Sequence, residues 1–164
     1  MTSTSEGLRL ALVRHAKSDW GDAFLDDHDR PLGDRGLRDA PVMARRLAES
    51  GFRVDAILSS TALRAATTAD YFGAALGVPV EHQERLYGAP GSLLLQAAAE
   101  HGATSVMVVA HDPGMTVLAG RLSDGEIGHM PTCAVATFAW ETDDWDVATS
   151  LDPVTWTFDA PRGR

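Results

Sequence analysis

The sequence predicts a single α/β domain of three layers, with a largely parallel central sheet between two layers of helices. Short apolar runs alternate with helix-like segments along the chain, a pattern typical of βαβ units and a parallel sheet. The chain has 164 residues, of which 45% are hydrophobic and 23% charged, as in an ordinary globular domain. We therefore expect one domain over 1–164, with 1–7 and 160–164 as flexible tails.

The strands are predicted from short apolar runs. LRLALV at 8–13 and TSVMVVA at 104–110 are nearly continuous in apolar residues, as expected for strands covered on both faces. TWTFDA near the end alternates, which favours an edge strand. The predicted strands, in chain order, occupy 8–13, 55–60, 78–83, 104–110, 133–140 and 155–160.

The helices are predicted between these runs. In the segment 33–51, Leu37, Met43 and Leu47 belong to an apolar stripe of helical period, and Gly51 is a stop signal. The segment 61–76 is rich in alanine and is followed by Gly77. The predicted helices occupy 33–51, 61–76, 92–102 and 113–122.

Charge and composition exclude several classes of function. The net charge is −9 and the isoelectric point is about 4.9, which argues against a nucleic-acid partner because such proteins need clustered Lys and Arg. Cys133 is the only cysteine, so no intramolecular disulfide can form. We see neither a secretory signal nor a membrane-spanning apolar run, and we expect a cytoplasmic protein without a membrane partner.

Basic side chains gather where three predicted strands end. Arg14 and His15 follow the first strand, Arg64 lies in the first turn after the second, and His111 follows the strand at 104–110. Ligands of open α/β sheets bind at the carboxyl ends of the strands. The sequence therefore predicts that these four side chains meet at one edge of the sheet.

The capping signals strengthen this prediction. Asp112 followed by Pro113 is typical of an N-cap and first helical residue, which would place His111 at the positive end of a helix. Ser60 or Thr61 is the expected N-cap before Arg64. Helical side chains lean toward the N-terminus, so Arg64 should point back at the strand ends.

Two arginines and two histidines at one edge suit a tetrahedral oxyanion such as phosphate. Guanidinium groups bind phosphate oxygens through charge-assisted hydrogen bonds, and a neutral imidazole can attack phosphorus. Phosphoryl transfer depends mainly on positioning and electrostatics, so no metal or cofactor is expected. We interpret the charged run at 26–30 as a solvated loop rather than a metal site, with Arg30 bordering the substrate entrance. Any one of these residues alone could be structural; their combination favours an oxyanion site.

The motifs LVRHAKSDW, RPLGDRG, SSTALRAATTA and VVAHDPGM occur in this order and resemble those of the histidine phosphatase superfamily, with the phosphoglycerate-mutase-like fold. The short chain, without an inserted cap segment, and MPTCAVATF resemble the SixA-type phosphohistidine phosphatase branch. The resemblance implies a hydrolase in which His15 is the nucleophile and forms a transient phosphohistidine. It further implies that Arg14, Arg64 and His111 bind the phosphoryl oxygens.

One position departs from the family pattern. Larger members place a carboxylate acid where this chain has Gly88, and Glu84 is the remaining candidate for a general acid. A phosphorylated imidazole leaves without a strong acid, whereas an alkoxide needs one. This favours phosphohistidine on a protein as the substrate. The alternatives are a phosphatase for a small phosphomonoester and a non-catalytic module that binds phosphate or a phosphoprotein.

Overall fold

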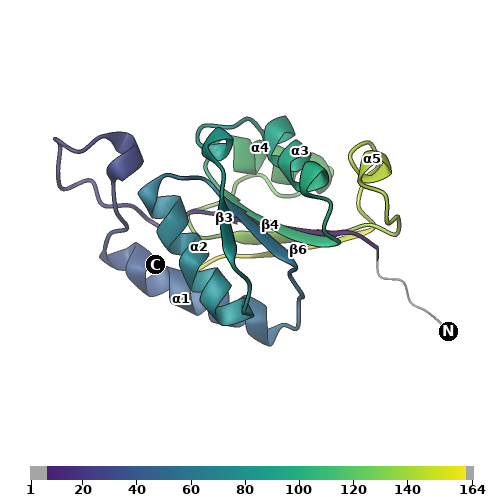
Figure 1. Ribbon diagram of the computed structural model, residues 1–164, viewed down its shortest axis with the longest axis horizontal. Helices are drawn as coiled ribbons and strands as arrows, with labels where there is room; N and C mark the ends of the chain where they lie inside the picture. The colour runs from purple at the N-terminus through teal and green to yellow at the C-terminus, as the bar shows by residue number, and fades with distance from the viewer. Residues whose placement is uncertain (1–6, 162–164) are drawn as a thin grey trace.

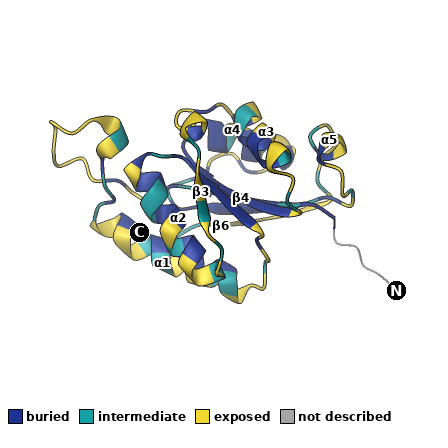
Figure 2. Cartoon of the chain, viewed as in Figure 1, coloured by how far each residue is buried: buried dark blue, intermediate teal, exposed yellow. Residues whose placement is uncertain are grey.

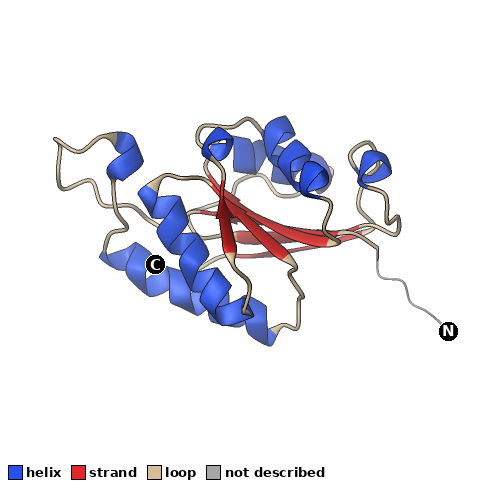
Figure 3. Ribbon diagram, viewed as in Figure 1, coloured by secondary structure: helices blue, strands red, loops and turns tan. Residues whose placement is uncertain are grey.

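The central sheet, drawn in red in Figure 3, has the strand order β3-β2-β4-β1-β5-β6. The computed structural model describes residues 7–161. Strands β1 to β4 are parallel to one another, while β5 is antiparallel to β1 and β6 is antiparallel to β5. This confirms the predicted α/β fold with a mostly parallel sheet. The strands are β1 (Arg9–Arg14), β2 (Ala56–Ser59), β3 (Val80–His82), β4 (Ser105–Ala110), β5 (Val135–Ala139) and β6 (Thr155–Asp159).

Helices cover both faces of the sheet (Figure 1). One face packs against α1 (Asp34–Glu49) and α2 (Leu63–Leu76). The other packs against α3 (Gly91–His101), α4 (Gly114–Leu122) and the short α5 (Trp145–Ala148). Two 3-10 helices, η1 (Asp27–Asp29) and η2 (Glu84–Leu86), lie in the loops after β1 and β3.

The alternation of side chains along β1 divides the core between these two faces. Successive strand residues point to opposite sides, so Leu10 and Leu12 pack toward α3 and α4, whereas Ala11 and Val13 pack toward α1 and α2. All four are fully buried, and burying a Leu or Val side chain is worth about 1.5–3 kcal/mol. Figure 2 shows the same burial along β4. The central strands therefore provide a rigid base for whatever follows their carboxyl ends.

The loop between β1 and α1 (residues 15–33) is fixed at its base by a close backbone approach. A Cβ atom on Gly36 would lie 2.2 Å from the carbonyl oxygen of Lys17, and this same carbonyl accepts a hydrogen bond from the N–H of Gly33 at 3.0 Å. The N–H of Asp19 also donates to the carbonyl of Pro31 at 2.8 Å. The two arms of the loop are thus tied together beside the end of β1.

The ends of the chain are only partly described. Residues 1–6 and 162–164, within the expected flexible tails, lie outside the described residues. Gly7 is buried, and Ala160 and Pro161 are half-buried. Among residues 7–161, none of the helices combines the length and apolar character needed to cross a bilayer.

Candidate active site

The exit of β1 is held by the strands on both sides of it. Arg14 is the last residue of β1, and the N–H of His15 donates to the carbonyl of Ala110 on β4 at 3.0 Å. From the other side, the N–H of Cys133 donates to the carbonyls of both Arg14 and His15, each at 3.0 Å. The side chains of Arg14 and His15 therefore project from a fixed backbone.

Arg64 enters the site from the first turn of α2, as predicted, and its side chain is buried. The prediction that Ser60 or Thr61 caps this helix is wrong, because the N-cap is Ala62. The hydroxyl oxygen of Ser60 instead accepts the N–H of Ala62 at 3.2 Å. This tight turn leaves the Ser60 hydroxyl hydrogen free for a partner across the site.

His111 follows β4 directly, but the helix after it starts later than predicted. The assignment of Asp112 as N-cap is wrong by one residue, because Pro113 is the N-cap of α4. The carboxylate of Asp112 still stabilises the helix start, accepting the N–H of Thr116 at 2.9 Å and its hydroxyl at 2.8 Å. The turn that carries His111 is therefore anchored to the first turn of α4.

One cavity of about 200 Å³ brings the four predicted basic residues together. The ring centroids of His15 and His111 are 5.1 Å apart. The candidate acid Glu84 is not among the residues that line the cavity, and it is exposed at the start of η2. The lining residues are Arg14, His15, Lys17, Ser18, Trp20, Arg30, Arg64, His111, Asp112 and Thr132.

The imidazole of His15 is neutral and has a defined tautomer. Its Nδ1 lies 2.7 Å from the carbonyl oxygen of Ala16, and a carbonyl only accepts, so Nδ1 carries the hydrogen. The pKa of His15 is lowered to about 4, mainly by burial and also by the charges of Arg64 and Arg14, against the opposing effect of the Ala16 hydrogen bond. At neutral pH the lone pair is therefore on Nε2.

The imidazole of His111 has the complementary arrangement. Its Nε2 lies 2.8 Å from the hydroxyl oxygen of Ser60, which already accepts the N–H of Ala62. If the Ser60 hydroxyl donates to Nε2, the hydrogen of His111 is on Nδ1. Burial lowers the pKa of His111 to about 3, and the neighbouring His15 and Arg64 contribute to this shift. This arrangement gives a neutral ring with a donor at Nδ1.

Three buried donors of the cavity residues have no partner within the described chain. They are Nε of Arg14, Nε of Arg64 and Nδ1 of His111. The Arg14 guanidinium is otherwise engaged, since Nη1 donates to the carbonyl of Met130 at 2.9 Å and lies 3.5 Å from the Asp112 carboxylate. Buried donors are rarely left unpaired in native proteins. Three of them around one cavity could all be satisfied by an anion bound there.

Sequence reasoning missed a second set of residues beside this cavity. Asp27 of η1 contacts Arg30 at 2.8 Å and Arg64 at 2.9 Å, and it accepts the hydroxyl of Tyr87. The interpretation of 26–30 as a merely solvated loop is therefore wrong for Asp27. Arg30 lines the cavity, in agreement with its expected place at the entrance. Asp27 could not be identified because its contacts depend on the path of the loop.

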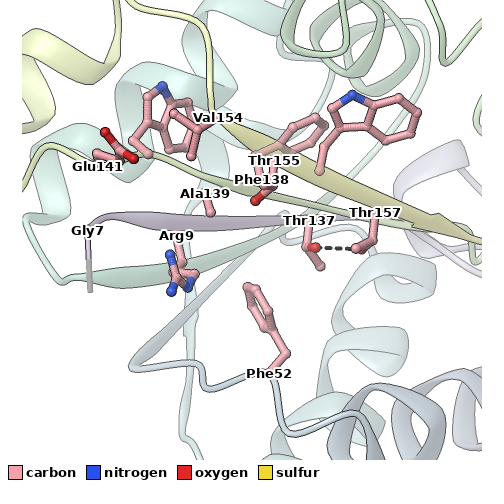
Figure 4. A pocket seen from close by; sticks show the side chains of 12 residues that line it. Gly7, Arg9, Phe52, Thr137, Phe138, Ala139, Glu141, Val154, Thr155 and Thr157 are labelled. Carbon is pink, nitrogen blue, oxygen red and sulfur yellow. Dashed lines mark hydrogen bonds between the residues drawn. The ribbon is translucent and has the colours of Figure 1, made fainter. Parts of the chain in front are cut away.

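The described chain has neither a group of metal-ligand side chains nor a histidine in its larger cavity. Within residues 7–161, no three His, Cys, Asp or Glu side chains form a group that could hold a metal ion. A larger cavity, of about 760 Å³, lies over β5 and β6 (Figure 4). Its lining includes Phe52 and the mutually hydrogen-bonded hydroxyls of Thr137 and Thr157, at 2.6 Å, but no histidine.

Comparison with known proteins agrees with this geometry. The family model of the histidine phosphatase superfamily (branch 1) matches residues 10–88. Phosphohistidine phosphatase SixA of Escherichia coli K12 is 32% identical over 140 residues, covering 79% of this chain and 84% of that protein. A SixA protein from Agrobacterium tumefaciens has a TM-score of 0.79 at 29% identity, covering 96% of this chain and all of the other. A SixA structure with tungstate has a TM-score of 0.71 at 26% identity, covering 93% and 95%. The resemblance seen in the sequence motifs is thus confirmed: the chain belongs to the histidine phosphatase superfamily and is a phosphatase related to the SixA proteins.

Proposed function

We propose that this phosphatase removes the phosphoryl group from phosphohistidine on a protein, through a transient phosphohistidine on Nε2 of His15. The observation that carries the proposal is the convergence of unpartnered donors from Arg14, Arg64 and His111 on a cavity that also contains the neutral His15. An anion bound there would satisfy all three donors. The similarity to the E. coli phosphohistidine phosphatase supports the choice of substrate.

Substrate binding relies on charge-assisted hydrogen bonds. Arg14 and Arg64 grip the phosphoryl oxygens through guanidinium N–H groups, and Nδ1–H of His111 donates to the same oxygens. As negative charge shifts among these oxygens in the transition state, donors already fixed in place stabilise it without reorganising. The chain's overall charge of −9 makes this local positive site necessary for capturing an anion.

The chemistry takes two displacements at phosphorus. In the first, Nε2 of His15 attacks, a P–N bond forms to the enzyme, and the P–N bond to the substrate imidazole breaks. The hydrogen bond from Nδ1 to the carbonyl of Ala16 stabilises the positive charge that develops on the His15 ring. In the second, water attacks phosphorus, which releases inorganic phosphate and neutral His15. The substrate imidazole takes its proton from solvent.

The carboxylates near the cavity are poorly suited to protonate an alkoxide. Hydrogen bonds from Tyr87 and from Arg30 and Arg64 hold the pKa of Asp27 well below its usual range, so it stays ionised. Asp112 accepts hydrogen bonds from Thr116 and faces Arg14. Gly88 has φ of +72°, a conformation that strains any residue with a side chain. A leaving group that needs no strong acid, such as imidazole, therefore suits this site better than an alkoxide.

The rim of the cavity supports a protein as the carrier of the phosphohistidine. Trp20 lines the cavity with its ring 3.4 Å from the Arg30 guanidinium, yet it is 69% exposed. Phe24, further along the same loop, is 98% exposed, and Leu25 is also exposed. Exposed apolar side chains on a loop that borders a binding site are typical of a surface that contacts another protein.

The test compares three phosphate donors: a phosphohistidine protein, an aryl phosphate and glycerol phosphate. We expect kcat/KM to be highest for the phosphohistidine protein and lowest for the alkyl ester. Highest activity on the alkyl ester, lost in Glu84→Gln, would instead support a small-ester phosphatase with Glu84 as acid. Binding of phosphate without turnover of any donor would indicate the non-catalytic module.

A second test asks whether a protein that carries the phosphohistidine contacts the exposed loop beside the cavity. Phe24→Ser should lower kcat/KM for the phosphohistidine protein about tenfold, as expected for loss of one buried aromatic contact, and leave the aryl phosphate unchanged. Val147→Ser is the control, because Val147 is an exposed apolar residue on α5, at the far end of the molecule from the loop (Figure 1). Equal effects of the two variants would argue against protein docking at the loop.

A further inference from the structure

We propose that Asp27 is a positioning residue of the phosphate site, which holds the guanidinium group of Arg64 in the orientation that binds the phosphoryl group and fixes Arg30 beside it. The inference rests on the proposed function, since it assumes that phosphate binds in the cavity. It gives η1, which contains Asp27, a role in phosphate binding.

The contacts of Asp27 reach both arginines at once. Its Oδ2 lies 2.9 Å from Nη2 of Arg64, and its backbone carbonyl accepts Nη1 of the same guanidinium at 2.6 Å. Its Oδ1 accepts Nη2 of Arg30 at 2.8 Å and Nε at 3.2 Å. The remaining nitrogen of Arg30, Nη1, donates to the hydroxyl of Ser18 at 2.6 Å. One residue thus fixes the plane of two guanidinium groups.

The contacts with Asp27 leave the Nε–H of Arg64 for the ligand. A guanidinium group has five N–H donors in a rigid fork. Asp27 engages Nη1 and Nη2, and Nε stays buried without a partner beside the cavity. Without Asp27, the long Arg64 side chain would regain rotamers, and fixing such a side chain on binding costs conformational entropy. Holding it in place beforehand lowers that cost when phosphate binds.

Asp27 also balances charge where two cations are packed closely. Arg30 and Arg64 are each only 6% exposed, and buried charges need an opposite charge nearby. The oxygen that contacts Arg64, Oδ2, also accepts the hydroxyl of Tyr87. Asp27 is not among the residues that line the cavity. It therefore pairs with the arginines from behind and does not occupy the place of the phosphate.

The experiment measures the dissociation constant of tungstate, a phosphate mimic, by calorimetry, together with kcat and KM for an aryl phosphate. Asp27→Asn keeps the size of the side chain but removes its charge. We expect it to weaken tungstate binding about tenfold and to raise KM. Asp29→Asn is the matched control: it removes an equal charge from the same 3-10 helix, at a carboxylate that is 63% exposed and lies 3.7 Å from His28. Asp29→Asn should change tungstate binding less than twofold.

A double-mutant cycle separates positioning from a general structural effect. If Asp27 acts through Arg64, Asp27→Asn should cause little further loss in an Arg64→Lys background, because coupled residues are not additive. Thermal unfolding of every variant identifies those that fail to fold, and Asp27→Ser then replaces Asp27→Asn.

Each of three results would overturn the inference: tighter tungstate binding in Asp27→Asn, equal losses in Asp27→Asn and Asp29→Asn, or full additivity with Arg64→Lys. The first would make Asp27 a competitor of the phosphate. Absence of tungstate binding to the wild-type cavity would instead refute the proposed function, and the inference with it.

Discussion

Replacing Ser60 by alanine tests how the cavity sets the proton on His111. Ser60 is fully buried, and its hydroxyl lies 2.8 Å from Nε2 of His111. The substitution removes the group that keeps the hydrogen on Nδ1 and leaves Nε2 buried without a partner. We expect Ser60→Ala to damage catalysis and stability together.

The two effects have separate magnitudes. An unsatisfied buried polar group costs about 1–3 kcal/mol, which corresponds to a fall in Tm of about 2–12 °C for a domain of this size. Removing an oxyanion donor altogether costs about 100- to 1,000-fold in kcat. Because His111 remains and can still adopt the Nδ1–H tautomer for part of the time, the loss in Ser60→Ala should be smaller, about tenfold.

The assay is turnover of an aryl phosphate at 25 °C, with thermal unfolding measured in parallel. Ser59→Ala is the control, because Ser59 is also fully buried but its hydroxyl donates to the carbonyl of Ser60 at 2.9 Å. It should lower Tm similarly and leave kcat within about twofold. Equal kcat in the two variants would refute the reasoning about the His111 tautomer.

Three further predictions concern pH, packing and metals. The pKa values of His15 and His111, about 4 and 3, lie below the ordinary value of 6.5, so the unfolded chain binds more protons than the folded one. The free energy of unfolding should therefore fall by a few kcal/mol as pH drops from 6.5 to 4. Denaturant titrations that give the same free energy of unfolding at both pH values would contradict this. Gly36→Ala should lower Tm and raise KM, because its Cβ would lie 2.2 Å from the carbonyl of Lys17, a cavity residue. An unchanged Tm and KM would mean that the loop at 15–33 is not fixed by this close approach. Guanidinium and imidazole groups supply the donors, so EDTA should leave turnover unchanged; a loss that zinc or magnesium restores would refute this.

Much of the fold could be predicted because its strongest signals are local. The apolar runs became β1, β2 and β4, since strands covered by helices on both faces must be apolar throughout. The alternating segment became β6 at one edge of the sheet. The antiparallel pairing of β5 with β1 was not predicted, because the direction of a strand depends on the path of the preceding loop. The helix α5 has four residues and gave no clear periodicity.

The residues of the candidate site also fall into those that the sequence predicts and those that it does not. Arg14, His15, Arg64 and His111 follow parallel strands or begin the next helix, so topology alone brings them to one edge. Asp27 and Tyr87 come from loops after β1 and β3, and their hydrogen bond joins positions 60 residues apart. Ser60 was interpreted as a helix cap, which is the commoner use of serine before a helix. Sequence spacing has no signal for such contacts.

The central claim is that Nε2 of His15 carries the phosphoryl group during turnover. The most direct measurement is to quench the reaction in alkali, where phosphohistidine survives, and to locate the phosphoryl group by mass spectrometry and ³¹P NMR. We predict a phosphoryl group on Nε2 of His15, and neither phosphoenzyme nor turnover in His15→Ala. Phosphorylation of His111 or of Nδ1 of His15, or turnover that persists in His15→Ala, would contradict the account.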